Sequence, residues 1–289
     1  MELGNQKILM AGLPEAGKTT FVAALWNYLN DVSTEKAFTV GTLADNDIEY
    51  LNSISGKWAS YETVGRNLGD LSTVKNIKMN LLRAGGSQVI LEVPDIAGEF
   101  FRDLFEQRKW PVEYESLLSE ITGVVLFIQS IDDNNAPKLI KQSQKLAQTA
   151  GEAENSIHDN QENIQQWTHS HTSSQVKLVE FLQFVLYHKA DILPLKVSVV
   201  ISQWDEIQKT TLNYTPEKWL EHYMSLLYQY LVCNNESYHV LSFGVSAQGG
   251  SYDENQEELQ TKKPIDRIIV QEGGNISNDI TKPIVWITG

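Results

Sequence analysis

Residues 12–19 read Gly-Leu-Pro-Glu-Ala-Gly-Lys-Thr and combine residue types that can bind phosphate. Glycines let successive backbone N–H groups turn inward around an anion, and a helix that begins here adds its positive end. Lys18 can then reach the outer phosphates of a nucleotide, while the Thr19 hydroxyl can bind Mg²⁺. We therefore predict a phosphate-binding loop. Its predicted ligand contacts are Gly12, Pro14, Glu15, Ala16, Gly17, Lys18, Thr19 and Thr20.

A second group with chemical potential is Asp95, which Gly98 follows three residues later. It comes directly after the apolar stretch 88–93, and an acid at the carboxyl end of a strand faces the ligand crevice of an open α/β sheet. We expect Asp95 to help hold Mg²⁺ and the Gly98 N–H to bind a γ-phosphate. Glu99 comes next, and its carboxylate can orient water there only if a cation offsets its repulsion from phosphate. The alternative is a helix-start acid that the helix dipole favours.

The elements that must position these residues alternate between strand and helix patterns. The run at 123–129 is continuously apolar, as is typical of a strand covered on both faces. Residues 74–83 and 88–93 flank Gly85-Gly86 and predict a β-hairpin with one strand at an edge. Further strands are predicted at 7–12, 195–202 and 238–245, and helices at 19–30, 174–189 and 216–232. This order predicts an α/β fold with a doubly wound, mostly parallel sheet and one antiparallel edge strand.

Two polar stretches interrupt this alternation within a single predicted P-loop domain spanning 1–289. Residues 132–175 are rich in Asn, Gln, Ser and Glu, and residues 248–280 in Gly, Glu, Asn and Lys. We expect both to be surface insertions that form helical excursions, partner-binding segments or mobile loops. Trp58 and Trp167 lie in polar surroundings, where each suits either a partner interface or the attachment of a polar segment to the core.

The composition limits the possible partners and compartment. The chain has 289 residues and a formal net charge of −14, so it has no overall positive field for nucleic acid or anionic lipid. Its one cysteine, Cys233, excludes an intramolecular disulfide and is expected to be buried. The apolar runs are far shorter than a membrane span, and no export signal is visible. We expect a cytoplasmic protein that binds neither nucleic acid nor membrane directly.

The phosphate loop followed by Asp95-Ile96-Ala97-Gly98 resembles the translation-factor-related P-loop GTPases, which include Ras-like switches. The similarity covers most of the predicted sheet. Where that class has an Asn/Thr-Lys-x-Asp element, this chain has Ser202-Gln203-Trp204-Asp205. The resemblance implies that Asp205 accepts hydrogen bonds from the N1 and N2 groups of guanine and that the Gln203 stem lies on the base.

A Ser-Ala-Lys-like turn completes the resemblance at Val245-Ser246-Ala247-Gln248. In the class, this turn implies that Ser246 and Ala247 present backbone N–H groups to the guanine carbonyl. Gln203 and Gln248 depart from the class pattern and weaken the preference for guanine. Where Ras-like proteins have a glutamine after the D-x-x-G glycine, this chain has Glu99, which implies slow intrinsic hydrolysis.

The resemblance also implies a first switch between about residues 55 and 73, with a threonine that meets Mg²⁺ and the γ-phosphate. Thr73 is our first choice for this ligand and Thr63 our second, although either fits a polar loop. Arg66 in the same segment can act as an internal arginine finger, but a solvated surface arginine is the commoner case.

The opening AGLPEAGKTTFVAALW and the closing KPIVWI resemble bacterial double-GTPase-type proteins, which are regulatory components of multi-gene conflict and signalling systems. The resemblance implies a GTP-binding, slowly hydrolysing switch with bound Mg²⁺ and a protein partner, in which Lys18, Gly98 and Glu99 serve hydrolysis. The first alternative is a non-hydrolysing scaffold, which Gln203, Gln248 and Glu99 favour and the intact phosphate loop opposes. The second is a P-loop ATPase or nucleotide kinase, which the scarcity of arginines disfavours.

Overall fold

The computed structural model describes residues 6–33, 35–64, 76–83, 86–94, 120–131, 172–189, 193–210 and 213–289, with positions 104, 107–110, 115 and 118. Several predicted residues lie outside this described part: Arg66, Thr73, Asp95, Gly98, Glu99 and Trp167. The same holds for residues 132–171, which make up most of the first predicted insertion.

The core of the protein is a nine-stranded sheet in the order β2-β3-β4-β1-β5-β6-β7-β8-β9. The strands are β1 (Gln6–Gly12), β2 (Phe38–Val40), β3 (Asn76–Arg83), β4 (Gln88–Pro94), β5 (Gly123–Gln129), β6 (Leu195–Ser202), β7 (Tyr238–Ser246), β8 (Ile269–Glu272) and β9 (Asn275–Ser277). The central strands β4, β1, β5, β6 and β7 are parallel to their neighbours in this series. Their carboxyl ends therefore share one edge of the sheet.

The prediction of one antiparallel edge strand is wrong in its details. Both β3 and β8 run antiparallel to the central strands, and neither lies at an edge. The outermost strands are β2, where Phe38 pairs with Arg83 of β3, and β9, where Ile276 pairs with Gln271 of β8. Such short outer strands limit the length of exposed edge that another chain could extend.

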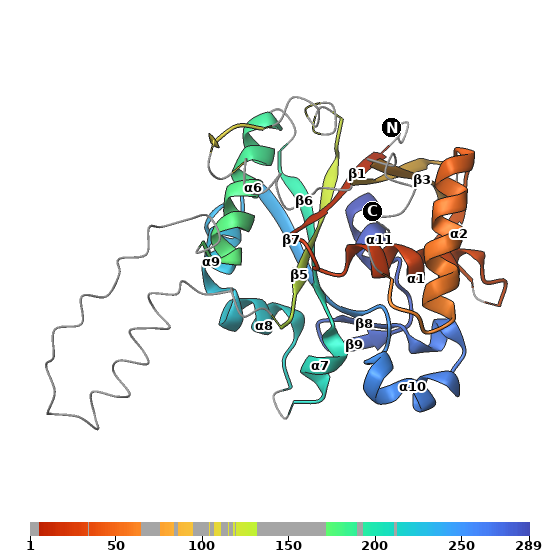
Figure 1. The fold of residues 1–289 in the computed structure, drawn as a ribbon. Helices are drawn as coiled ribbons and strands as arrows, with labels where there is room; N and C mark the ends of the chain where they lie inside the picture. Colours follow the sequence, from red (N-terminus) through yellow and green to blue (C-terminus); the bar gives the residue numbers. More distant parts are fainter. Residues whose placement is uncertain are drawn as a thin grey trace, which may run out of the picture.

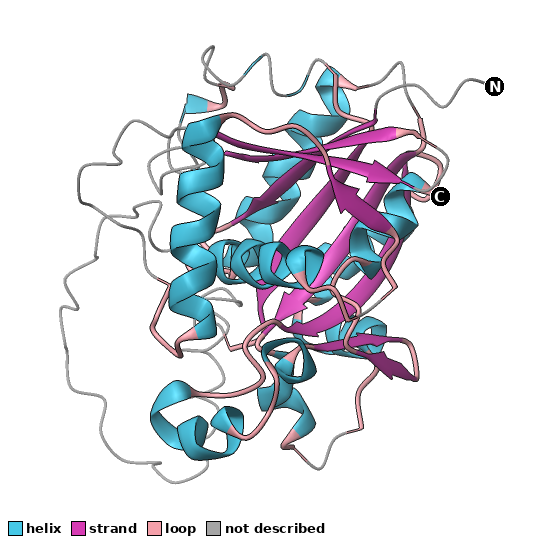
Figure 2. Ribbon diagram, turned by 90° about the vertical axis from the view of Figure 1, so that its right-hand side faces the viewer, coloured by secondary structure: helices cyan, strands magenta, loops and turns pink. Residues whose placement is uncertain are grey.

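Helices cover both faces of the sheet, which confirms the doubly wound arrangement. Along β1, Ile8 and Met10 face one core cluster, while Leu9 and Ala11 face the other. Helices α1 (Lys18–Asn30), α2 (Asp45–Ala59) and α11 (Lys282–Thr288) contribute to the first cluster. Helices α6 (Ser174–His188), α8 (Pro216–Tyr223) and α9 (Ser225–Cys233) contribute to the second. Figure 1 shows the two groups on opposite sides, and Figure 2 turns the α1 and α2 side toward the viewer.

The helix predicted over 216–232 is divided into α8 and α9 at Met224, which is fully buried. Its predicted start is confirmed, because the Thr215 side chain accepts a hydrogen bond from the Lys218 N–H and Pro216 occupies the first turn. Cys233 is exposed, so the expectation of a buried thiol is wrong. It lies at the last position of α9, beside the half-exposed Val232, on the side of the helix away from the core.

Residues 248–280 are part of the main architecture. They form α10 (Tyr252–Gln260), a 3-10 turn η3 (Pro264–Arg267) and the strands β8 and β9, which extend the sheet. Trp58 is fully buried near the end of α2, so its place is in the core. In the part of the chain that the structure describes, none of the helices combines the length and apolarity needed to cross a membrane.

Candidate functional site

The loop between β1 and α1 wraps around the ammonium group of its own lysine. Lys18 Nζ donates hydrogen bonds to the carbonyls of Gly12, at 2.7 Å, and Leu13, at 2.9 Å. Only 9% of the Lys18 residue is exposed. A positive charge is thus fixed at the amino end of α1, where the helix dipole adds positive potential.

Two close approaches explain why the loop needs glycine at both ends. A Cβ at position 12 would lie 2.6 Å from the Phe127 carbonyl oxygen on β5. Gly17 has a φ of 85°, and a Cβ there would lie 3.0 Å from the Cβ of Ser202 on β6. The loop therefore rests directly on the carboxyl ends of two central strands.

The remaining predicted loop residues surround this contact. Pro14 and Glu15 are exposed, with Glu15 in the left-handed region at a φ of 64°, and Ala16 is buried. The Ala16 N–H donates to the Leu13 carbonyl at 3.3 Å. Thr19 and Thr20 are half-buried in the first turn of α1.

A cleft of about 450 Å³ opens beside the loop, between α1 and the carboxyl ends of β5, β6 and β7. Its walls come from segments that are far apart in the sequence. The lining includes Glu15, Gly17, Thr20, Phe21, Phe127, Val200, Ser202, Gln203, Asp205, Glu206, Ser246, Ala247, Gln248, Gly250 and Glu254. The structure thus brings the phosphate loop together with both predicted base-reading elements.

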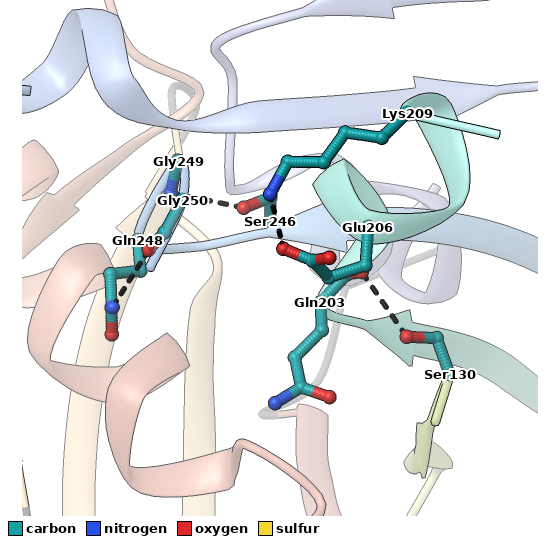
Figure 3. A network of polar contacts seen from close by, with 8 residues as sticks. All are labelled: Ser130, Gln203, Glu206, Lys209, Ser246, Gln248, Gly249 and Gly250. Atoms are coloured by element: carbon teal, nitrogen blue, oxygen red, sulfur yellow. Dashed lines mark hydrogen bonds and ion pairs between the residues drawn. The ribbon is translucent and has the colours of Figure 1, made fainter. Parts of the chain in front are cut away.

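A short chain of hydrogen bonds orients the Asp205 carboxylate in this cleft. The Gly249 N–H donates to Ser246 Oγ at 3.0 Å, and the Ser246 hydroxyl in turn donates to Asp205. Burial raises the pKa of Asp205 above its usual value, and the bond from Ser246 partly offsets this shift. Ser246 is itself only 1% exposed and Asp205 is half-buried, so a buried hydroxyl of the turn holds the carboxylate. Figure 3 shows the turn side of this chain, from Gly249 to Ser246.

Gln203 and Gln248, the two departures from the class pattern, have different surroundings. Gln203 begins helix α7 (Trp204–Gln208) in a left-handed conformation with a φ of 54°, and its carbonyl accepts a hydrogen bond from Ser130 Oγ at 3.1 Å. Its side chain is exposed and lines the cleft. The Gln248 amide instead donates to the Gly250 carbonyl at 2.8 Å, so its side chain closes its own turn.

Two acidic residues that line the cleft, Glu206 and Glu254, were not predicted from the sequence. Glu206 follows Asp205 in α7, and its carboxylate is 2.5 Å from Lys209 Nζ (Figure 3). Glu254 reaches the same cleft from α10. The ion pair of Glu206 and Lys209 could be predicted from their i,i+3 spacing in a helix. The place of Glu254 could not, because only the tertiary fold brings α10 to this cleft.

The predicted Mg²⁺ ligands and switch residues are only partly in the described part of the chain. Of Thr19, Thr73 and Asp95, the structure describes only Thr19. Residues 55–59 of the expected first switch belong to α2, where Trp58 is buried in the core. Thr63 is exposed and lies beyond the end of that helix. Within the described ranges, no three or more Asp, Glu, His or Cys side chains cluster as a metal site.

Comparison with protein-family models shows which family this chain belongs to. The family model described as Double-GTPase 1 matches residues 9–287. The chain is a member of this family. The matched range contains the phosphate loop, Asp205 and the Ser246-Ala247 turn, so this double-GTPase chain is a GTP-binding regulatory protein of the P-loop GTPase class, as its motifs predicted.

Comparison with solved structures matches the small COPII coat GTPase Sar1 of Encephalitozoon cuniculi in complex with GDP. The two chains are 15% identical, and the alignment covers 87% of this chain and 74% of Sar1 with a TM-score of 0.37. No curated protein sequence matches the double-GTPase chain significantly.

Proposed function

We propose that the cleft binds GTP and GDP with the guanine between Gln203, Asp205 and the Ser246-Ala247 turn. The observation that carries this proposal is that Asp205, hydrogen-bonded to the buried Ser246, lines the same cleft as Glu15 and Gly17 of the phosphate loop. A carboxylate in that place accepts from the N1 and N2 groups of guanine. Adenine has no matching pair of donors at those positions.

The phosphates in this proposal lie on the loop from Gly12 to Thr19, with Lys18 turning from the loop carbonyls toward the outer phosphates. Mg²⁺ would be held by Thr19 with Asp95 and Thr73, a set of hard oxygen ligands that suits this ion. When bound, Mg²⁺ would neutralise charge on the outer phosphates. Gly98 would bind the γ-phosphate through its N–H and so sense whether it is present.

We propose slow intrinsic hydrolysis, with Glu99 beside the γ-phosphate as its cause. Glu99→Gln is expected to raise phosphate release severalfold, because the amide removes the charge repulsion and can still orient water. Steady-state phosphate release from GTP measures this, with Glu236→Gln as a control at an exposed carboxylate that is not among the cleft-lining residues. Abolished turnover in Glu99→Gln would instead make Glu99 a direct contributor to hydrolysis.

The regulatory part of the proposal is a cytoplasmic switch that gates a protein partner in a bacterial conflict or signalling system. The family match supports this reading, and the charge of −14 gives no reason to invoke nucleic acid or anionic membrane. The exposed Gln203 and the loop-bound Gln248 favour a non-hydrolysing scaffold as the second candidate. Nucleotide binding separates the two, since a pure scaffold has no physical need for the buried Lys18.

Hydrogen exchange with mass spectrometry tests where the nucleotide binds. Addition of GDP is expected to protect backbone amides at 12–19 and 244–250, while ADP at the same concentration protects the first segment less and the second not at all. Protection at neither segment, or equal protection by GDP and ADP, would contradict the proposed base and phosphate contacts.

The pH dependence of binding provides a further prediction. Only the ionised form of Asp205 accepts both guanine hydrogen bonds, and burial raises the pKa of this carboxyl. GDP affinity is therefore expected to fall as the pH is lowered from 7.5 toward 5. The ligand-free protein should gain stability over the same change, because a carboxyl with a raised pKa favours the folded state when it is protonated.

Titration calorimetry and thermal melting at several pH values measure both effects. Asp205→Asn is the control, because it keeps the phosphate contacts but cannot titrate. An equal fall in GDP affinity in wild type and variant would assign the pH dependence to other groups.

A further inference from the structure

The last turn of α2 is hydrogen-bonded to the base-side turn of the cleft. Trp58 Nε1 donates to the Ala247 carbonyl at 3.1 Å, across 189 residues of sequence. The Trp58 residue is fully buried. Ala247 lines the cleft, whereas Trp58 does not.

Three further contacts hold the indole in place. The Arg267 guanidinium lies 4.3 Å from the Trp58 ring centroid and donates through Nη2 to the Trp58 carbonyl at 3.3 Å. The Tyr252 hydroxyl donates to the same carbonyl at 3.2 Å. Arg267 is only 1% exposed, so a charged side chain has been buried at the back of this turn, an arrangement that is costly unless the charge is well partnered.

The end of α2 carries a strained residue at the same place. Tyr61 adopts a left-handed conformation with a φ of 61°, which is unusual for a bulky side chain. Its ring lies 4.4 Å from the Arg267 guanidinium, and its hydroxyl donates to the Leu259 carbonyl at 3.1 Å. Contacts from η3 and α10 therefore fix the helix end against the turn that follows β7.

We propose that Trp58 is a positioning residue for guanine recognition, which rests on the proposed function. In a trans peptide the C=O and N–H groups point in opposite directions. The peptide between Ala247 and Gln248 has its carbonyl on Trp58, so the Gln248 N–H points away from Trp58. Ala247 and Gln248 both line the cleft. In this proposal the Gln248 N–H donates to the 6-oxo group of guanine, in addition to the N–H groups of Ser246 and Ala247.

The residues that follow this peptide explain why it needs an anchor. Gly249, with a φ of 85°, and Gly250 come directly after Gln248. Glycines rotate at little steric cost, so the peptide could turn its N–H away from the base. The hydrogen bond from the Trp58 indole holds the peptide in one orientation. A substitution of the Trp58 side chain removes this hydrogen bond to the Ala247 carbonyl.

The experiment compares GDP with 2-aminopurine riboside diphosphate, which keeps the N2 amino group but lacks the 6-oxo group and the N1–H. The analogue binds more weakly for both reasons, so the readout is the change that the variant causes for each ligand. Trp58→Phe removes the indole N–H and retains an aromatic ring in the same space. Its GDP affinity is expected to fall about fivefold, the effect of one neutral hydrogen bond, while the affinity for the analogue stays at the wild-type value. Tyr61→Phe removes a hydroxyl from the same cluster and should change neither affinity.

Each outcome bears on a separate claim. Equal losses for both ligands, or no loss for GDP in a folded Trp58→Phe protein, would overturn the positioning role. A wild-type protein that does not prefer GDP to ADP would instead overturn the proposed function. If Trp58→Phe does not fold, the assigned indole N–H resonance of Trp58 in the wild-type protein decides. It should shift more with GDP than with the analogue, and equal shifts would contradict the proposal.

Discussion

Lys18→Ala is expected to bind GTP at least tenfold more weakly than the wild-type protein. Lys18 is the buried cation of the loop, and its ammonium already lies 2.7 Å from the Gly12 carbonyl at the amino end of α1. A charge-assisted contact to phosphate is among the strongest polar interactions that a protein makes. Its removal leaves the backbone N–H groups and the helix dipole to hold the phosphates alone.

The loss in Lys18→Ala should depend on the number of phosphates, because Lys18 is expected to reach the outer ones. Calorimetric affinities for GTP, GDP and GMP are therefore expected to converge in the variant. Lys262→Ala is the matched control, since Lys262 pairs with Glu258 on α10 and is not among the cleft-lining residues. An unchanged GTP affinity in a folded Lys18→Ala protein would contradict the assignment of the phosphate loop.

Asp205→Asn is expected to reverse the base preference of the cleft. The carboxylate accepts from two donors on guanine, whereas an amide presents one acceptor and one donor. Xanthine carries a carbonyl where guanine carries its N2 amino group, so it matches the amide and is repelled by the carboxylate. The loss of a hydrogen-bonded charge predicts that GTP affinity falls at least tenfold while XTP affinity rises.

The ratio of GTP to XTP affinity is the readout, because both ligands carry the same phosphates. Glu206→Gln tests whether the effect belongs to Asp205, since Glu206 is the adjacent acid and pairs with Lys209. Glu206→Gln should retain the preference for GTP. An equal loss of GTP and XTP in Asp205→Asn would show that Asp205 supports the turn and does not read the base.

The sequence predicted the central sheet well because buried parallel strands have a strong local signature. β5 is an apolar run closed by a glutamine and β6 is mostly apolar, and the predicted residues of both agree with the structure. The phosphate loop was equally readable, because its chemistry depends on residue types at fixed local spacing. The hairpin of β3 and β4 was visible from alternation and from the glycines at its turn.

The outer elements were missed because they are short and depend on tertiary pairing. β2 and β9 have three residues each, too few for a periodic pattern. The pair β8 and β9 has one local turn signal, Gly273-Gly274, but the polar composition around it is equally typical of a surface loop. α2 begins at Asp45, and Ala44 before it offers no capping side chain. The buried residues of α2 are spread among polar ones.

In the candidate site too, local sequence signals could be predicted and tertiary contacts could not. Asp205 and the Ser246-Ala247 turn could be predicted because each follows the end of a strand, in the order that the resemblance implies. The contact of Trp58 with the turn could not be predicted, since a tryptophan in a polar stretch suits an exposed interface as well as a core. Only the folded chain brings its indole to a carbonyl 189 residues away.

Titration of nucleotide-stripped protein with GTP, GDP and ATP in the presence of Mg²⁺, followed calorimetrically, tests the central claim most directly. Phosphate release measured on the same sample adds the rate of hydrolysis. The account predicts micromolar or tighter binding of GTP and GDP, much weaker binding of ATP and slow release of phosphate. Equal affinities for GTP and ATP, or binding of none of the three, would contradict it.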